Sequence, residues 1–179
     1  MGNSIFGDGA AAAVVTHTGF RGTPPPAPAV PAAPFAVESP EFEWQLGPMC
    51  SEIVPDSEGQ MTWKQSLQAG RYDMWLGREI PGALQRLFGG KGLQIFARVG
   101  LNPFTCAYAL HPGGKAILAG FENVLGTMGA KGEGIDASKE VLRRYGNMSS
   151  ATIFFVLQRV LSSTSRDGVF FAGFGPGAW

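Results

Sequence analysis

One junction, at residues 104–125, constrains the fold of this chain more than any other stretch. Residues 104–110 are apolar and aromatic, which is typical of a short buried strand. His111 ends that run, and a Pro-Gly-Gly turn separates it from apolar residues at helical spacing between Ile117 and Leu125. A strand followed directly by an amphipathic helix is the building unit of α/β folds. The junction therefore predicts an α/β domain with a histidine at a strand end.

A second junction follows, where a helix predicted over residues 137–145 stops at Gly146. Asn147 comes next, and the helix predicted over 151–161 is apolar on nearly every side, which predicts that it is buried all round. Taken separately, a lone histidine is more often structural, and a Gly-Asn turn is usually a helix stop. Together, an imidazole and a carboxamide held by rigid elements can direct two N–H donors at one substrate oxygen.

Composition excludes several function classes. The 179 residues suffice for one domain with a sizeable core. Fourteen basic side chains balance fourteen acidic ones, so no net charge favours nucleic acid or an anionic membrane as a partner. No stretch approaches the ~20 apolar residues of a membrane span. The N-terminus lacks the charged start of a signal peptide, so a cytoplasmic protein is expected.

The metal-binding and redox-active residue types are few. His17 and His111 are the only histidines, and no carboxylates cluster near them, so no metal site is predicted. Cys50 and Cys106 have no metal-ligand spacing and are too few for a disulfide framework. Cys106 lies in the apolar run before His111, and we expect it to be a small core residue.

The remaining chain predicts further strands, a linker and a broken helix. Residues 41–53 alternate well enough for a strand and are expected to pair antiparallel with a strand at 72–76, and a last strand is predicted at 168–174. Residues 23–40 hold most of the proline, which predicts an exposed linker with polyproline character. The glycine run at 89–92 is expected to interrupt a helix.

Five short motifs occur in order along the chain. Phe-Gly-Asp-Gly-Ala-Ala-Ala stands at residues 6–12 and Pro-Asp-Ser-Glu-Gly at 55–59. His-Pro-Gly-Gly follows at 111–114, Tyr-Gly-Asn-Met-Ser-Ser at 145–150 and Gly-Phe-Gly-Pro-Gly at 173–177. Together they resemble the C-terminal half of the type III polyketide synthases, the chalcone and stilbene synthase family.

The resemblance implies a thiolase-like fold, in which helices and sheets are layered as αβαβα and two similar halves pack on each other. Residues 1–179 are then expected to be the C-terminal half only, truncated at both ends, with the proline-rich stretch at 23–40 as an insertion. The resemblance also implies a buried strand at 10–15, although alanine alone would suggest helix. Full-length members are implied to be homodimers, so a missing N-terminal half or a homologous subunit is the expected protein partner.

The resemblance also implies a reaction. In the family, a cysteine accepts an acyl starter from coenzyme A, malonyl-CoA loses carbon dioxide, and the resulting enolate attacks the acyl thioester. Negative charge grows on the thioester oxygen, and losing one of two fixed N–H donors to it typically costs about 3–4 kcal/mol. By resemblance those donors are His111 and Asn147. Malonyl-CoA and an acyl-CoA starter are the substrates, and no cofactor beyond these thioesters is implied.

Five further positions are implied to contact the substrates. Gly113 and Ala116 match positions that pass close to the pantetheine arm, where a small residue lets the ligand approach the backbone. Met74 stands where the family has a gatekeeping phenylalanine, so the starter unit does not follow from the resemblance. Phe174 and its loop are expected to shape the cyclisation cavity, and Ser149 to line it.

The family's nucleophilic cysteine and its basic residues for the CoA phosphates belong to the N-terminal half, so three functions stay open. The chain is part of an acyltransferase that needs the missing half, or a non-catalytic fragment or partner of a full-length homologue. The third is a ketoacyl synthase III of fatty-acid synthesis. The Pro-Gly-Gly after His111 and the Met-Ser-Ser after Asn147 argue against the third.

Overall fold

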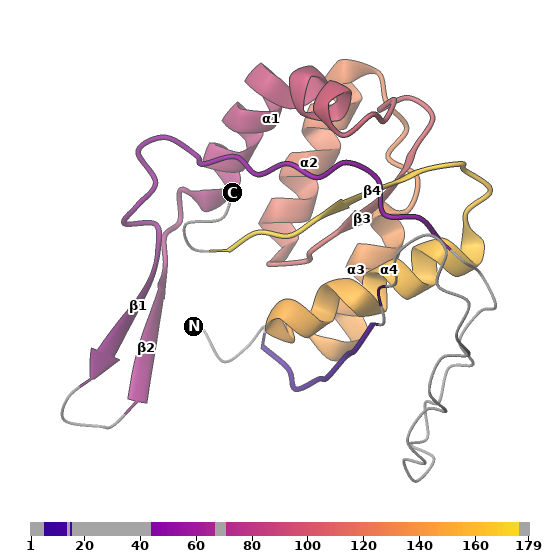
Figure 1. The fold of residues 1–179 in the computed structure, drawn as a ribbon. Helices are drawn as coiled ribbons and strands as arrows, with labels where there is room; N and C mark the ends of the chain where they lie inside the picture. Colours follow the sequence, from indigo (N-terminus) through magenta and orange to yellow (C-terminus); the bar gives the residue numbers. More distant parts are fainter. Residues whose placement is uncertain (1–5, 14, 16–43, 67–70, 176–179) are drawn as a thin grey trace, which may run out of the picture.

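The computed structural model describes residues 6–13, 15, 44–66 and 71–175, and Figure 1 shows their arrangement. The predicted proline-rich linker at 23–40 lies outside the described residues. The elements are, in chain order, β1 (Met61–Ser66), β2 (Arg71–Leu76), α1 (Ile80–Arg98), β3 (Ala107–Leu110), α2 (Lys115–Met128), α3 (Ile135–Tyr145), the 3-10 turn η2 (Ser149–Ala151), α4 (Thr152–Ser163) and β4 (Val169–Ala172).

The centre of the fold is a parallel pair of strands, β3 and β4, in register with Ala107 opposite Val169. Helices α1 and α2 cover one face of this pair, and α3 and α4 cover the other (Figure 1). Alternate residues of β3 point into the two helical layers. Tyr108 packs with α1 and α2, while Ala109 packs with α3 and α4. Both faces of β3 are buried, which explains its continuous apolar run. The predicted α/β fold is confirmed.

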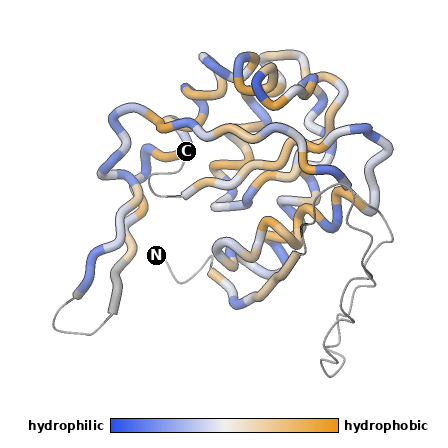
Figure 2. The backbone as a smooth tube through the Cα atoms, viewed as in Figure 1, coloured by the Kyte–Doolittle hydropathy of each residue, from blue (hydrophilic) through white to orange (hydrophobic). Residues whose placement is uncertain are grey.

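Phe170 of β4 is the centre of the core between the sheet and the α1–α2 layer. Its ring centroid lies 4.5 Å from that of Phe96, 6.3 Å from that of Phe88 and 6.1 Å from that of Tyr108. The buried hydroxyl of Tyr108 needs a partner and donates a hydrogen bond to the carbonyl of Pro103 at 2.6 Å. Figure 2 shows hydrophobic residues concentrated along β3 and β4, between the two helical layers.

Helix α1 passes without a break through the glycine run at 89–92, so the predicted interruption is wrong. Each glycine costs about 1 kcal/mol relative to alanine. Burying one large apolar side chain contributes about 1.5–3 kcal/mol, and α1 buries such residues on both sides of the run. Tertiary packing therefore outweighs local propensity. The buried residues of α1 are Ile80, Ala83, Leu84, Leu87, Phe88, Gly92, Ile95 and Phe96.

The glycines of α1 allow a test of this balance. Gly89 and Gly90 are exposed, and a Cβ at either would meet no heavy atom within 4 Å. We expect Gly89→Ala and Gly90→Ala each to raise the free energy of unfolding by about 0.5–1 kcal/mol in urea titrations, because alanine loses less backbone entropy. Gly100→Ala is the opposing control and should lower it, since Gly100 has a φ of +69°. A destabilised Gly89→Ala would contradict the helical assignment.

Two predicted strands are wrong for the described residues. Residues 10–13 and 15 form no strand and are exposed, because these small side chains gain little from burial. The described part of 41–53 is also not a strand, and Leu46 and Met49 point to solvent with exposed fractions of 66% and 84%. The predicted strand at 72–76 is confirmed as β2, but its antiparallel partner is β1, and the two form a hairpin that projects from the body (Figure 1).

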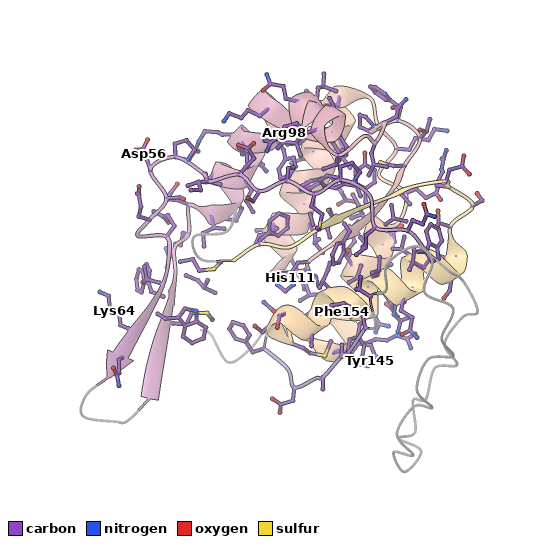
Figure 3. The ribbon with its side chains drawn as sticks, in the orientation of Figure 1. Asp56, Lys64, Arg98, His111, Tyr145 and Phe154 are labelled. Carbon is purple, nitrogen blue, oxygen red and sulfur yellow. The ribbon has the colours of Figure 1, made fainter. Side chains whose placement is uncertain are left out.

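The segment before the hairpin is held against α1. The Glu52 carboxylate lies 3.4 Å from the Lys91 ammonium and also pairs with the guanidinium of Arg98, which Figure 3 labels on α1. Val54 is 6% exposed and joins the same core as the buried face of α1. Exposed ion pairs contribute only about 0–1 kcal/mol, so Val54 is the firmer of the two attachments.

The helices predicted around 117–125, 137–145 and 151–161 are confirmed as α2, α3 and α4. The expectation that the last is buried all round is wrong. Val156 is fully buried, but Phe154 is 36% exposed, because the described residues cover only the sheet-facing side of α4. Within the described residues, none of the helices combines the length and the apolar character that crossing a bilayer requires.

Candidate functional site

His111 lies directly after β3, where the sequence predicts it. Its backbone N–H continues the strand pairing by donating to the carbonyl of Ala172 at 2.9 Å, and its side chain is only 8% exposed. Burial lowers the pKa of the His111 imidazole, so the ring is neutral at pH 7 and keeps one N–H donor. The Gly113 N–H donates to the His111 carbonyl at 3.0 Å, and a Cβ at Gly113 would lie 3.7 Å from the ring.

The lowered pKa of His111 gives a testable pH dependence. The unfolded chain takes up this proton near pH 6.5, while the folded chain takes it up only at lower pH. The contribution of neutral His111 to stability is therefore present above about pH 6.5 and is lost as pH falls through the folded pKa. Urea unfolding between pH 4 and 8 should show this loss, and His111→Gln should flatten that part of the profile. An identical slope in His111→Gln would contradict the assignment.

Asn147 lies between α3 and η2 and is 7% exposed. Its Oδ1 accepts a hydrogen bond from the backbone N–H of Ser149 at 2.9 Å. The Thr152 hydroxyl is 3.5 Å from the same oxygen but 2.7 Å from the Ser149 carbonyl, which takes its single proton. Since a backbone N–H can only donate, the atom facing Ser149 must be the carboxamide oxygen. The NH₂ group of Asn147 therefore points away from this turn and is presented as a donor.

The two residues lie at the same edge of the sheet. A Cβ at Gly134 would contact both Tyr108, near the start of β3, and Val160, near the end of α4. Helix α4 therefore runs against β3, as Figure 1 shows, and its N-terminal end lies toward the end of β3 that carries His111. Figure 3 shows the His111 side chain on the side of β3 that faces this end of α4. The expectation that His111 and Asn147 donate to one oxygen, each roughly 3 Å away, stays a prediction.

Of the five other predicted positions, four lie near this edge and one does not. Gly113 lies in the turn before α2, and Ala116 is the second residue of α2 and is exposed. Phe174 follows β4 and packs its ring 6.4 Å from that of Phe121. Ser149, at the start of η2, is exposed. Met74 lies on β2 in the projecting hairpin, opposite Trp63 (Figure 1).

Two hollows of the described part of the chain lie away from these residues. One is lined by residues of the turn before β1 and of α1, and includes Ser57 and Leu84. The other lies on the hairpin beside Lys64 and Trp75. His111 and Asn147 line neither of these two hollows, and both side chains are buried.

Sequence reasoning missed two residues that support the site. Thr152 is fully buried and closes the turn after Asn147 through its bond to Ser149. Gly7 donates its N–H to the carbonyl of Asn147 at 3.1 Å. The pattern Asn-x-Ser could have indicated a side-chain-to-backbone turn at Asn147, because Asn oxygens commonly accept from the N–H two residues later. No local signal pairs Gly7 with Asn147.

Comparisons with known proteins bear on the family and the fold of the chain. The family profile "Chalcone and stilbene synthases, C-terminal domain" matches residues 45–178. A fungal type III polyketide synthase, ORAS, is 26% identical with a TM-score of 0.60, over 71% of this chain and 36% of that one. The C-terminal type III polyketide synthase domain of Steely1 from Dictyostelium is 26% identical with a TM-score of 0.60, over 73% of this chain and 37% of that one.

A third structure is similar in fold. It is 1,3,6,8-tetrahydroxynaphthalene synthase from Streptomyces coelicolor A3(2), which is 23% identical with a TM-score of 0.63, over 74% of this chain and 38% of that one. The chain thus spans little more than a third of the length of these proteins. The profile match extends over well more than half of the chain, and it includes His111 and Asn147. The chain therefore belongs to the chalcone and stilbene synthase family and has the α/β fold of the C-terminal half of a type III polyketide synthase.

Proposed function

We propose that this chain is the C-terminal part of an acyltransferase of the type III polyketide synthase class, with malonyl-CoA and an acyl-CoA starter as substrates. His111 and Asn147 act as the two N–H donors to the thioester oxygen of malonyl-CoA. One observation supports the proposal: a buried imidazole follows β3, and a buried carboxamide oriented by Ser149 precedes α4, whose N-terminal end lies toward the same end of β3. Ligands of open α/β sheets bind at the carboxyl ends of the strands, which is where His111 and Phe174 lie.

The chemistry needs donors rather than acids at these positions. When the malonyl carboxylate leaves as carbon dioxide, the electron pair of the broken C–C bond moves onto the thioester oxygen. A neutral His111 donates one hydrogen bond to that oxygen without first losing a proton, and the Asn147 amide donates another. The enolate carbon then attacks the acyl thioester carbonyl, and the thiolate leaves. Each donor is expected to contribute about 3–4 kcal/mol to the decarboxylation transition state.

The acyl group needs a cysteine that we propose to come from outside this chain. The thiol of Cys106 is buried, and burial raises its pKa, which disfavours the nucleophilic thiolate. Cys50 is half-buried against the core that α1 and α2 form with the sheet. Cys106 directly precedes β3, so it lies at the opposite end of that strand from His111. We therefore propose that an N-terminal half, as a separate chain or as part of a longer one, supplies the nucleophile and completes the pocket in a cytoplasmic homodimer.

One observation favours a second candidate function, a non-catalytic partner of a full-length homologue. Cys106 is buried and Cys50 is half-buried, so the described residues offer no exposed thiol to carry an acyl group. Condensation requires such an acyl-enzyme. In this alternative, the chain binds a homologue but turns over no malonyl-CoA even when paired.

The two candidates are separated by complementation. Radiolabelled malonyl-CoA and a starter thioester are incubated with this chain alone, with a separately expressed N-terminal half of a homologue alone, and with both. We expect no polyketide from either piece alone and carbon dioxide release from the pair. Binding of the two halves without any turnover would favour the non-catalytic partner. Polyketide formed by this chain alone would mean that one of its own cysteines is the nucleophile.

A further inference from the structure

The short segment at residues 6–9 lies against the turn that carries Asn147. Phe6 and Asn147 form an isolated parallel bridge, and the N–H of Gly7 donates to the carbonyl of Asn147 at 3.1 Å. Figure 1 shows the described N-terminal segment running beside the start of α4. Two stretches from opposite ends of the chain therefore meet at the candidate donor.

Glycine makes this approach possible. A Cβ added at Gly7 would lie well under 3.0 Å from the backbone carbonyl oxygen of Tyr145, which cannot move without moving the helix end. A Cβ at Gly9 would lie well under 3.0 Å from the Met148 sulfur, at the flexible end of a side chain. Neither glycine has a positive φ, so the need for glycine is one of space and not of backbone conformation. Gly7 is the stricter of the two positions.

Asn147 is held from two directions as a result. Its backbone carbonyl is fixed by Gly7, and its side-chain oxygen is fixed by the N–H of Ser149. Ser149 has a φ of +58°, which is unfavourable for a residue with a Cβ and needs support from its surroundings. If the carbonyl of Asn147 lost its partner, the turn would be free to relax, and the carboxamide would lose the orientation that presents its NH₂ group.

We propose that Gly7 is a positioning residue for Asn147, and that the segment Phe6–Gly9 serves as the support that sets the direction of the Asn147 carboxamide. The importance of this for turnover rests on the proposed function of Asn147 as a donor. The positioning itself does not, because it concerns the hydrogen bond between Asn147 and Ser149, which forms without substrate.

The test is amide hydrogen exchange of the full chain, resolved to single residues by mass spectrometry. The reporter is the Ser149 N–H, which is protected only while it donates to the Asn147 side chain. In Gly7→Ala we expect this amide to exchange about tenfold faster, as for the loss of one typical hydrogen bond. The reference is the Tyr108 N–H, which donates to the Glu133 carbonyl at 2.8 Å and should keep its rate. Gly47→Ala is the matched control, since a Cβ there meets no heavy atom within 4 Å.

A purely structural role gives a different pattern. If Gly7 merely stabilised the fold, Ser149 and Tyr108 would exchange faster by the same factor, and the proposal would be overturned. If Gly7→Ala does not fold, Gly9→Ala replaces it, because the flexible end of Met148 can give way. Faster exchange at Ser149 alone is expected again, with a smaller factor. An unchanged Ser149 rate in the folded variant overturns the proposal.

Turnover by the complemented enzyme separates this proposal from the proposed function. Gly7→Ala should lower kcat for malonyl-CoA decarboxylation with little change in KM, and adding it to Asn147→Ala should cause no further loss, because both act through one carboxamide. A further loss in the double variant overturns positioning through Asn147. If Asn147→Ala itself has no effect, the proposed function fails, while the exchange result at Ser149 still decides the positioning role.

Discussion

Replacing His111 or Asn147 with alanine is expected to lower malonyl-CoA decarboxylation about 10²-fold or more in the complemented enzyme, since each change removes one of two hydrogen bonds to the developing enolate oxygen. The loss should fall mainly on kcat, because the bond strengthens as negative charge develops. Release of radiolabelled carbon dioxide from malonyl-CoA measures it. The double variant should lose less than the product of the two single losses, because residues that act as a unit are not additive.

Two substitutions serve as controls for the loss of a donor. Asn147→Asp keeps an oxygen that can accept from the Ser149 N–H but replaces the NH₂ donor, so the turn is retained while the activity falls. His111→Gln keeps an N–H donor and should lose less activity than His111→Ala. Full activity in Asn147→Asp would contradict the donor role of Asn147, whatever the alanine variant does.

The isolated chain is expected to self-associate. Phe171 of β4 stands opposite Ala109 in the register and so points to the α3–α4 side of the sheet, where it is 45% exposed. Phe154 of α4 is 36% exposed, and residues 10–13 are exposed as well. Contiguous apolar patches above a few hundred Å² promote association. Sedimentation velocity should therefore show oligomers whose fraction rises with concentration, and adding the N-terminal half should reduce them.

Surface substitutions locate the associating face. Phe154→Gln combined with Phe171→Thr should shift the chain toward the monomer. Leu93→Gln is the matched control, because Leu93 is 60% exposed but belongs to α1 on the opposite layer. A monodisperse, cooperatively unfolding monomer of the unsubstituted chain would show instead that the described residues already form a self-sufficient domain.

The elements that the sequence predicted well are those with a strong local pattern. The apolar run before His111 became β3, with both faces buried, and the helical spacing after it became α2. Two predictions failed because a local pattern was not sufficient. Glycine propensity argued against a continuous α1, but packing of this helix against the core outweighed it. Alternation argued for a strand at 41–53, but the described residues 44–53 pair with no other strand. Val54, buried against α1, illustrates a contact that no local pattern reveals.

The candidate site likewise has features that the sequence could predict and features that it could not. The residue types at His111 and Asn147, and their places at element ends, could be predicted from the sequence. The direction of the Asn147 carboxamide could not, because it depends on a hydrogen bond to Ser149 and on the approach of Gly7 from the other end of the chain. The neutral state of His111 also depends on burial by the folded chain, which spacing alone does not give.

The pairing of β3 with β4 has a consequence for how the chain is made. The two strands are adjacent in the sheet, but α2, α3 and α4 lie between them in sequence. During synthesis, β3 leaves the ribosome well before β4 has been made. Its unpaired hydrophobic edge therefore stays exposed while the three helices are synthesised. Pairs so distant in sequence form late, because the intervening chain must first be ordered. The aromatic cluster around Phe170 is completed only then, so this core stays prone to aggregation until residues 169–172 have been made.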